Sequence, residues 1–181
     1  MSSFNRRAVF FDRDGTVVKS IYRTNIGRFT APFSLQELEF APNSEIAVRS
    51  LKNNDFLCIL ATNQPDVSYG YITPDDWSAI QKAVIAKLPF DDVFMCRHPR
   101  TEQCYFRKPN PGMLLAAADK FGIDPRQSWM IGDMDVDMRA GKAAGCKTIL
   151  LNRPYNKDFA PLADYAVDDV LQAAMIAIPT S

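Results

Sequence analysis

Short apolar runs alternate with amphipathic helical segments along this chain, and this alternation constrains the fold more than any other feature. The runs are rich in Val, Ile, Leu and Phe without regular polar residues between them, which is typical of strands buried on both faces. Strands that alternate with helices predict a parallel sheet covered by helices on both sides. The expected strands are Ala8–Asp12, Phe56–Thr62, Asp92–Cys96, Ser128–Gly132, Lys147–Leu151 and, with a weaker pattern, Ala163–Val167.

The expected helices are marked by residues typical of helix ends. Thr73 can cap a helix that has Pro74 at its first position, and Gly122 and Gly145 follow two helical patterns as glycine often does. The sequence therefore predicts a doubly wound parallel α/β sheet, in one domain spanning residues 1–181. The helices are expected at Pro42–Asn54, with Ile46 and Leu51 on one face, and at Pro74–Leu88, Pro111–Phe121, Asp135–Ala144 and Asp169–Ile178.

One long irregular segment, Lys19–Ala41, follows the first expected strand. It is polar and aromatic, and it is too short to form an independent cap domain. We interpret it as a flap over the site, and a plain surface loop is the alternative.

Composition narrows the function classes. Lys plus Arg and Asp plus Glu number 21 each, so the formal net charge is zero and offers no basic field for nucleic acid or an anionic membrane. No apolar stretch is long enough to span a membrane, and the N-terminus lacks the apolar core of a signal peptide. Four scattered cysteines favour a reduced, cytoplasmic protein, and nothing in the pattern fixes an oligomeric state.

The first strand ends in two carboxylates, Asp12 and Asp14, which flank Arg13. In an extended chain, residues two apart point to the same side, so both carboxylates are expected to face one spot. A divalent cation there would relieve their repulsion, and Mg²⁺ prefers carboxylate oxygens, water and phosphate. An ordinary Asp-Gly turn is the alternative at this position.

Three further sites follow expected strands or lie in the loops after them. "ILATNQ" supplies Thr62 and Asn63 to hold a phosphate oxygen, "RKPNPG" supplies the basic residues Arg107 and Lys108, and "MIGDMDVD" supplies Asp133 as a third carboxylate. Each has an ordinary alternative: a turn, a solvated basic pair, or an acidic residue at a helix start. Because ligands bind beyond the carboxyl ends of parallel strands, we expect these residues to meet.

In this order, the motifs resemble those of the haloacid dehalogenase-like (HAD) phosphohydrolase superfamily. Its pattern is D-x-D-G-T, a Ser or Thr after the second strand, a basic residue, and G-D-x-x-x-D. The resemblance implies a Rossmann-like fold without a cap. The matching residues are Asp12-Arg13-Asp14-Gly15-Thr16, Thr62, Lys108, and Gly132-Asp133 through Asp137.

The resemblance implies a role for each acidic residue. Asp12 would attack the phosphorus and form an aspartyl-phosphate, and Asp14 would protonate the leaving oxygen and then deprotonate water. Mg²⁺ would be held by Asp12, the Asp14 carbonyl and Asp133. Asp137 is one helical turn from Asp133, so we expect it beside the metal ligands rather than among them, with Asp135 pointing away.

The two basic residues are expected to diverge. Lys108 precedes a proline and should be extended, which turns its side chain away from that of Arg107. We expect Lys108 to meet the phosphate and Arg107 to contact a distal part of the substrate.

The segment before "RKP" resembles the C-x-H…C-x-C zinc loop of the histidinol-phosphatase and heptose-bisphosphate phosphatase branch. Here Cys96, His98 and Cys104 match three ligands, and Phe106 occupies the fourth position. Structural zinc is nearly always held by four protein ligands. We therefore favour a loop that no longer holds Zn²⁺, with Phe106 packed in place of the metal. Three ligands completed by water are the alternative.

These features predict a Mg²⁺-dependent phosphomonoesterase for a small sugar phosphate, such as a heptose 1,7-bisphosphate. Histidinol phosphate and a polynucleotide 3′-phosphate are alternative substrates, and the zero net charge argues against the latter. Two non-enzymatic alternatives are a signalling receiver that accepts phosphate without turnover and a scaffold that has lost catalysis.

Overall fold

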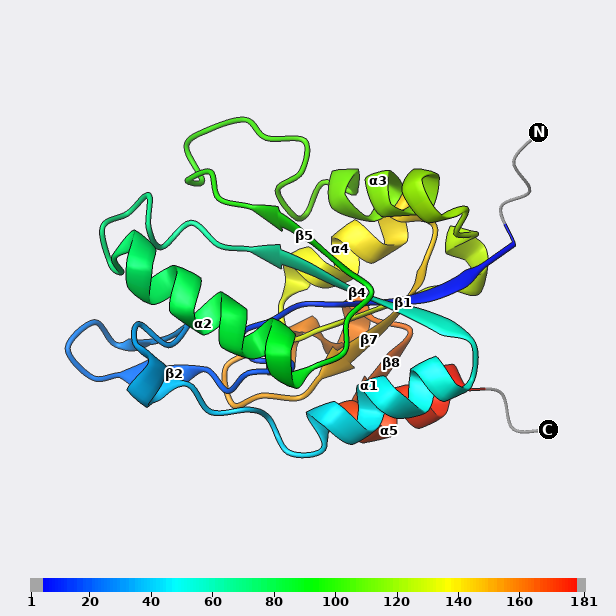
Figure 1. Cartoon of the computed structure of the whole chain (residues 1–181), viewed down its shortest axis with the longest axis horizontal. Helices are drawn as coiled ribbons and strands as arrows, with labels where there is room; N and C mark the ends of the chain where they lie inside the picture. Colours follow the sequence, from blue (N-terminus) through cyan, green and yellow to red (C-terminus); the bar gives the residue numbers. More distant parts are fainter. Residues whose placement is uncertain (1–4, 179–181) are drawn as a thin grey trace.

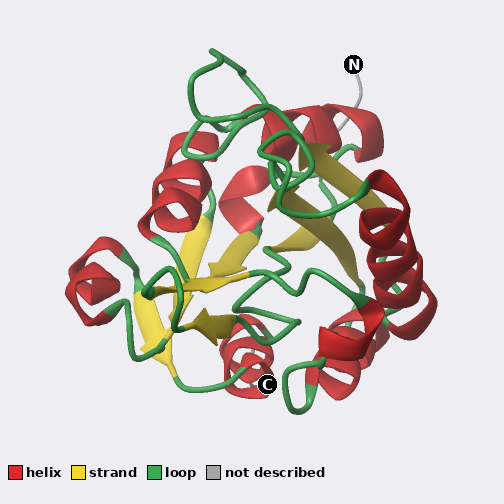
Figure 2. Cartoon of the chain, turned by 90° about the vertical axis from the view of Figure 1, so that its left-hand side faces the viewer, coloured by secondary structure: helices red, strands yellow, loops and turns green. Residues whose placement is uncertain are grey.

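The computed structural model describes residues 5–178 and contains a six-stranded sheet in the order β5-β4-β1-β6-β7-β8 (Figure 1, Figure 2). Every pairing within this sheet is parallel, as the unalternating apolar strands predicted. All six predicted strands are present, with ends that differ by at most two residues. They are β1 Arg7–Phe11, β4 Phe56–Asn63, β5 Asp92–Cys96, β6 Trp129–Gly132, β7 Lys147–Leu151 and β8 Tyr165–Val167.

Helices cover both faces of the sheet, and alternate residues of β1 face the two sides. Val9 and Phe11 pack in a core with α1, α2 and α5, whereas Ala8 and Phe10 pack in a second core with α3 and, at its end, α4. Figure 1 shows α1 and α5 together on one side of the sheet and α3 on the other. The helices are α1 Ser44–Asn53, α2 Pro74–Lys87, α3 Gly112–Phe121, α4 Asp135–Ala144 and α5 Val170–Ala177, with short 3₁₀ helices at Leu35–Glu37, Pro125–Gln127 and Lys157–Leu162.

The first helix departs from the expected packing. Leu51 is fully buried, but Ile46 is 55% exposed, so the expectation that they share the buried face was wrong. Five helical positions correspond to a rotation of about 140°, which places the two side chains on different sides of the helix. Ala47 and Val48 pack inward together with Leu51.

The segment between β1 and α1 forms a hairpin that the sequence analysis did not predict. Its strands, β2 Ile21–Arg23 and β3 Arg28–Thr30, pair antiparallel. The Arg23 guanidinium lies 3.9 Å from the ring centre of Phe33 and donates to Glu37 at 2.7 Å. Such short strands are marginal alone, so these side-chain contacts stabilise the hairpin in place.

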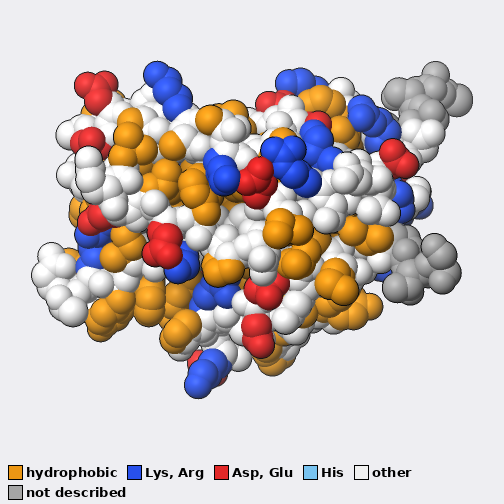
Figure 3. All heavy atoms as spheres, turned by 60° about the horizontal axis from the view of Figure 1, so that its bottom comes forward, with side chains coloured by type: hydrophobic (Ala, Val, Ile, Leu, Met, Phe, Trp, Pro, Cys, Tyr) orange, Lys and Arg blue, Asp and Glu red, His pale blue; other side chains and the backbone are white. Residues whose placement is uncertain are grey.

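The surface carries charges of both signs. On the face shown in Figure 3, acidic and basic side chains are interspersed with apolar ones, in keeping with the zero net charge. Within residues 5–178, no helix has the length and apolar character required to cross a membrane.

Candidate active site

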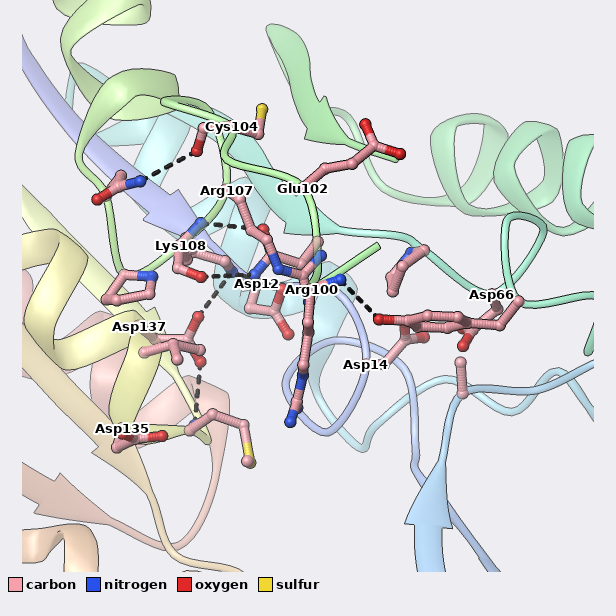
Figure 4. A pocket seen from close by; sticks show the side chains of 18 of the residues that line it. Asp12, Asp14, Asp66, Arg100, Glu102, Cys104, Arg107, Lys108, Asp135 and Asp137 are labelled. Carbon is pink, nitrogen blue, oxygen red and sulfur yellow. Dashed lines mark hydrogen bonds and ion pairs between the residues drawn. The ribbon is translucent and has the colours of Figure 1, made fainter. Parts of the chain in front are cut away.

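Three adjacent strands deliver polar residues to one edge of the sheet. Asp12 directly follows β1, Asn63 ends β4, and Asp133 follows β6 at the next residue. Because β1 pairs with β4 on one side and β6 on the other, these residues converge at the carboxyl ends of the central strands. Figure 4 shows Lys108, from the loop between β5 and α3, lying between Asp12 and Asp137, with Asp135 farther from them.

Lys108 is the cation at the centre of this group, and its side chain is only 1% exposed. Its Nζ donates to Asp12 Oδ1 at 2.7 Å and to the Ala61 carbonyl at 2.7 Å, and it pairs with Asp137 Oδ1 at 2.6 Å. Burial alone would lower the pKa of this ammonium, but the carboxylates of Asp12 and Asp137 raise it above the ordinary value. Lys108 therefore stays charged at neutral pH.

Asn63 holds the main chain of Lys108. Its side-chain amide donates to the Lys108 carbonyl at 3.0 Å and accepts from the Lys108 N–H at 3.1 Å. Thr62 is fully buried, and its hydroxyl accepts a hydrogen bond from the Gln64 side chain. Thr62 does not line the cavity described below. Of the pair predicted to hold a phosphate oxygen, Asn63 is thus the one that reaches the cavity.

Three carboxylates, those of Asp12, Asp133 and Asp137, lie with one oxygen each within 4.8 Å of one another. Burial, followed by repulsion from the other two, raises the pKa of Asp133 well above its usual range. Burial also raises the pKa of Asp137 to about 6, although Lys108 counteracts this shift. The cluster therefore holds more negative charge than its surroundings compensate.

The free oxygens of this cluster fit a hard divalent cation. Asp133 Oδ2 accepts from the Tyr155 hydroxyl at 2.5 Å, whereas its buried Oδ1 has no hydrogen-bond partner in the described residues. Asp137 accepts from the Met134 N–H through Oδ2 and pairs with Lys108 through Oδ1. Asp133 thus has a free oxygen of the kind that Mg²⁺ prefers, and Asp12 and Asp137 lie beside it.

Asp14 takes a different position from the one expected. Both of its oxygens accept from Arg13 at 2.9 Å, and Gln64 donates to Oδ2 at 2.7 Å. Its carboxylate is therefore not part of the three-carboxylate cluster, although Asp14 lines the same cavity. Strand β1 ends at Phe11, so the alternation that would align Asp12 with Asp14 stops before Asp14.

Arg13 is a site residue that the sequence analysis missed. It is 1% exposed, and besides Asp14 it donates to Gln81 of α2 at 3.1 Å. An arginine between two aspartates resembles an exposed turn residue, and its partner on α2 is 68 positions away. No local pattern could have revealed this contact.

Two glycines permit the close packing around the carboxylates. Gly15 has φ +84°, and a Cβ there would lie 2.1 Å from Asp133 Oδ2. At Gly132, a Cβ would lie 2.4 Å from the Cγ of Asp137. Either side chain would displace a carboxylate of the cluster, which explains why both positions are glycine.

A cavity of about 1140 Å³ opens above these residues. The hairpin contributes Arg28, Phe29 and Thr30 to its wall, as expected of a flap. Arg100 and Arg107, from the loop between β5 and α3, also line it. Arg107 Nη1 donates to the His98 carbonyl at 2.7 Å, so its side chain diverges from that of Lys108.

Asp66, which lines the cavity, is another residue that the sequence analysis missed. Burial, followed by the charge of Asp14, raises its pKa. Asp66 follows the predicted "TNQ" motif by two residues, next to a proline, and carries no pattern that would mark it.

The cysteine loop brings its three predicted ligands together. One donor atom each from Cys96, His98 and Cys104 lies within 4.8 Å of the others, and Cys96 Sγ is 3.6 Å from His98 Nδ1. Phe106 is 38% exposed and contacts Tyr105 edge to face at 6.4 Å between ring centres. The described residues thus offer three donors, which do not fit the closed four-ligand site typical of structural zinc.

Comparison with known proteins places this site in a family context. A family model described as HAD-hydrolase-like matches residues 105–173. The chain is 32% identical over 184 residues to a D-glycero-beta-D-manno-heptose-1,7-bisphosphate 7-phosphatase of Pasteurella multocida, covering 91% of this chain and 93% of the relative. It is 35% identical over 158 residues to a D-glycero-alpha-D-manno-heptose-1,7-bisphosphate 7-phosphatase of Burkholderia mallei, covering 80% of this chain and 79% of the relative.

A solved structure shares the fold over nearly the whole chain. It is the D,D-heptose 1,7-bisphosphate phosphatase from B. bronchiseptica complexed with magnesium and phosphate. The TM-score is 0.78 at 25% sequence identity, and the match covers 95% of this chain and 97% of the other.

Proposed function

The chain belongs to the HAD family of phosphoric monoester hydrolases, and from that premise we propose that it is a Mg²⁺-dependent phosphatase acting on a heptose 1,7-bisphosphate. The observation that carries this proposal is the arrangement of Lys108 between Asp12 and Asp137, beside Asp133, whose Oδ1 has no hydrogen-bond partner among residues 5–178. It combines a nucleophile, a buried cation and a set of free carboxylate oxygens at the base of one cavity.

Asp12 is the proposed nucleophile. Lys108 donates to its Oδ1 and so orients the carboxylate. One oxygen of this carboxylate attacks the phosphorus, and the P–O bond to the sugar breaks as the aspartyl-phosphate forms. Lys108 then lies where charge develops on the phosphoryl oxygens, which it stabilises electrostatically. Water attacks the phosphorus of this intermediate in the second step and releases inorganic phosphate and free Asp12.

Asp14 is the proposed acid and base. It donates a proton to the leaving sugar oxygen and takes one from the attacking water. Because Arg13 engages both Asp14 oxygens, Asp14 has to exchange this partner for the substrate oxygen before either transfer. Gln64 contacts the same carboxylate and keeps it at the cavity wall during that exchange.

Mg²⁺ would be held by Asp12, Asp133 and the main-chain carbonyl of Asp14. When bound, it neutralises carboxylate and phosphate charge and so lets the two anions approach each other. Asp137 supports the arrangement by fixing Lys108.

The cavity wall supports a bisphosphate substrate. Arg28, Arg100 and Arg107 line the cavity in addition to Lys108, so it offers cations beyond the one that meets the reacting phosphate. Guanidinium groups bind phosphate oxygens in pairs, and we assign Arg107 to a distal phosphate of the substrate. Thr62 lies behind this surface, and its predicted contact with phosphate remains a prediction.

The test is phosphate release from a panel of substrates with and without MgCl₂. The panel contains both anomers of heptose 1,7-bisphosphate, histidinol phosphate and a 3′-phosphorylated oligonucleotide. We expect Mg²⁺-dependent turnover with the heptose bisphosphate preferred, and ³¹P NMR of the product identifies the phosphate removed. Preference for another substrate, or a phosphorylated protein that never releases phosphate, would contradict the proposal.

The Asp12→Asn variant tests the covalent step. The amide cannot attack phosphorus, so we expect turnover to disappear. Asp119→Asn is a matched control, because Asp119 is exposed on α3 away from the cavity. Turnover by Asp12→Asn at the wild-type rate would exclude Asp12 as nucleophile.

A further inference from the structure

Tyr155 belongs to no motif recognised in the sequence, yet it contacts a carboxylate of the site. It lies in the loop after β7, 22 positions from Asp133, and its hydroxyl is 2.5 Å from Asp133 Oδ2. The next residue, Asn156, donates to the Asp133 carbonyl at 2.7 Å and to the Leu151 carbonyl at 2.8 Å. The loop is therefore attached to both the main chain and the side chain of Asp133.

The ring of Tyr155 is held from the other side by the flap. Phe29 of β3 packs against it with 4.5 Å between ring centres, and Ser20 Oγ lies 3.4 Å from its hydroxyl. Gly15 leaves room for this contact, since a Cβ there would lie 2.7 Å from the Tyr155 hydroxyl. In this contact the phenolic O–H donates and the carboxylate oxygen accepts.

The hydrogen bond decides which oxygen of Asp133 is available. Oδ2 is engaged by Tyr155, whereas Oδ1 is buried and has no hydrogen-bond partner in the described part of the chain. The carboxylates of Asp12 and Asp137 lie within 4.8 Å of that of Asp133, so without the hydroxyl their negative charges would favour rotation of the Asp133 carboxylate away from the cluster. A carboxylate that is fixed beforehand binds a cation without first losing rotational freedom.

We propose that Tyr155 is a positioning residue that fixes Asp133 Oδ2, so that Oδ1 faces the divalent cation, and that Phe29 of the flap holds the Tyr155 ring in place. This inference rests on the proposed function, because it assigns Asp133 to Mg²⁺. It adds a residue outside the family motifs to the machinery of this chain, and it links the flap to the metal site through one aromatic contact.

The test measures Mg²⁺ binding to the full chain by isothermal titration with MgCl₂ and no substrate. Tyr155→Phe keeps the ring and removes only the hydroxyl. Loss of a hydrogen bond that orients a metal ligand typically costs about 10- to 100-fold in affinity, so we expect a rise of that size in the Kd for Mg²⁺. The matched control is Tyr165→Phe, because Tyr165 is 47% exposed on β8 and outside the cavity.

A second readout separates positioning from a structural role. If Tyr155 acts through the metal, turnover by Tyr155→Phe falls at low MgCl₂ and recovers as MgCl₂ is raised to saturation. A fold defect would not recover in this way. Phe29→Leu provides an independent variant, for which we expect the Kd to rise by a smaller factor because the hydroxyl remains.

The outcomes distinguish this inference from the function on which it rests. A wild-type chain that does not bind Mg²⁺ would overturn the proposed metal function. A wild-type chain that binds Mg²⁺, with Tyr155→Phe binding it equally well, would overturn only the role of Tyr155. If Tyr155→Phe does not fold, Phe29→Leu provides the test. A Kd for Mg²⁺ equal to that of the wild type in Phe29→Leu overturns the link between the flap and Asp133, and with it the inference.

Discussion

Lys108→Met removes the one cation that, within residues 5–178, contacts the buried carboxylates of Asp12 and Asp137, and it keeps the apolar part of the side chain. The lost contacts are the three at 2.6–2.7 Å to Asp12, Asp137 and the Ala61 carbonyl. Removing one partner of a buried ion pair costs about 3–5 kcal/mol, because the other charge is left uncompensated. At about 2–4 °C per kcal/mol for a chain of this size, we expect the Tm to fall by about 6–20 °C at pH 7 in EDTA.

The matched control is Lys120→Met, which breaks a pair of the same length in solvent. Lys120 Nζ lies 2.7 Å from Asp92 Oδ2, but its side chain is 58% exposed. Exposed pairs contribute about 0–1 kcal/mol, so the Tm should fall by at most about 4 °C. The contrast compares a buried lysine that contacts two carboxylates and a carbonyl with an exposed lysine that pairs with a single carboxylate at the same distance.

Two further readouts sharpen this prediction. MgCl₂ should raise the Tm of Lys108→Met more than that of the wild type, because a bound cation replaces part of the lost charge. Turnover should fall by about 10²-fold or more, the typical cost of removing a group that stabilises the transition state. Equal melting of Lys108→Met and Lys120→Met in EDTA would show that Lys108 does not compensate the carboxylate charge, and would refute the reasoning.

Two other predictions concern metals. Burial raises the pKa of Asp133, and it raises that of Asp137 to about 6, whereas an unfolded aspartate has a pKa of about 4. The metal-free fold therefore binds protons more tightly than the unfolded chain does. Protonation of these two groups adds stability as the pH falls from 6 towards 4. The rise in Tm caused by MgCl₂ should be larger at pH 7.5 than at pH 5, and a pH-independent rise would contradict this. The cysteine loop offers three ligands rather than the four typical of structural zinc. Treatment with EDTA, followed by addition of MgCl₂, should therefore leave turnover intact. A lasting loss of turnover, together with one zinc per chain in metal analysis of the untreated protein, would contradict a loop without zinc.

The parts of the site that the sequence predicted share a local cause. Asp12 and Asp133 each follow a buried strand of the expected sheet, and a parallel sheet brings such positions to one edge regardless of other contacts. Lys108 could be predicted because it belongs to a fixed motif in the loop before α3. For these residues, position along the chain is enough to place the side chain near the site.

The parts that were missed depend on tertiary contacts between distant segments. Arg13 is buried because Gln81 of α2 accepts its hydrogen bond, and Tyr155 meets Asp133 because the loop after β7 folds back over the cluster. The β2–β3 hairpin has strands of three residues, which are too short for a periodic signal. The position of Asp14 differs because strand β1 ends at Phe11 and the chain already turns at Arg13, so the alternation of a strand no longer applies.

The charge count at the cluster explains why a divalent cation suits this fold. Three buried carboxylates face one buried ammonium, so full ionisation leaves an excess of two negative charges. Without a metal, protonation relieves this excess, and burial together with repulsion between the carboxylates raises the pKa values of Asp133 and Asp137. A monovalent cation would leave the cluster with one excess negative charge, whereas the two positive charges of Mg²⁺ would balance it. With its charge balanced in this way, the cluster would let an anionic phosphate approach Asp12, the nucleophile that we propose.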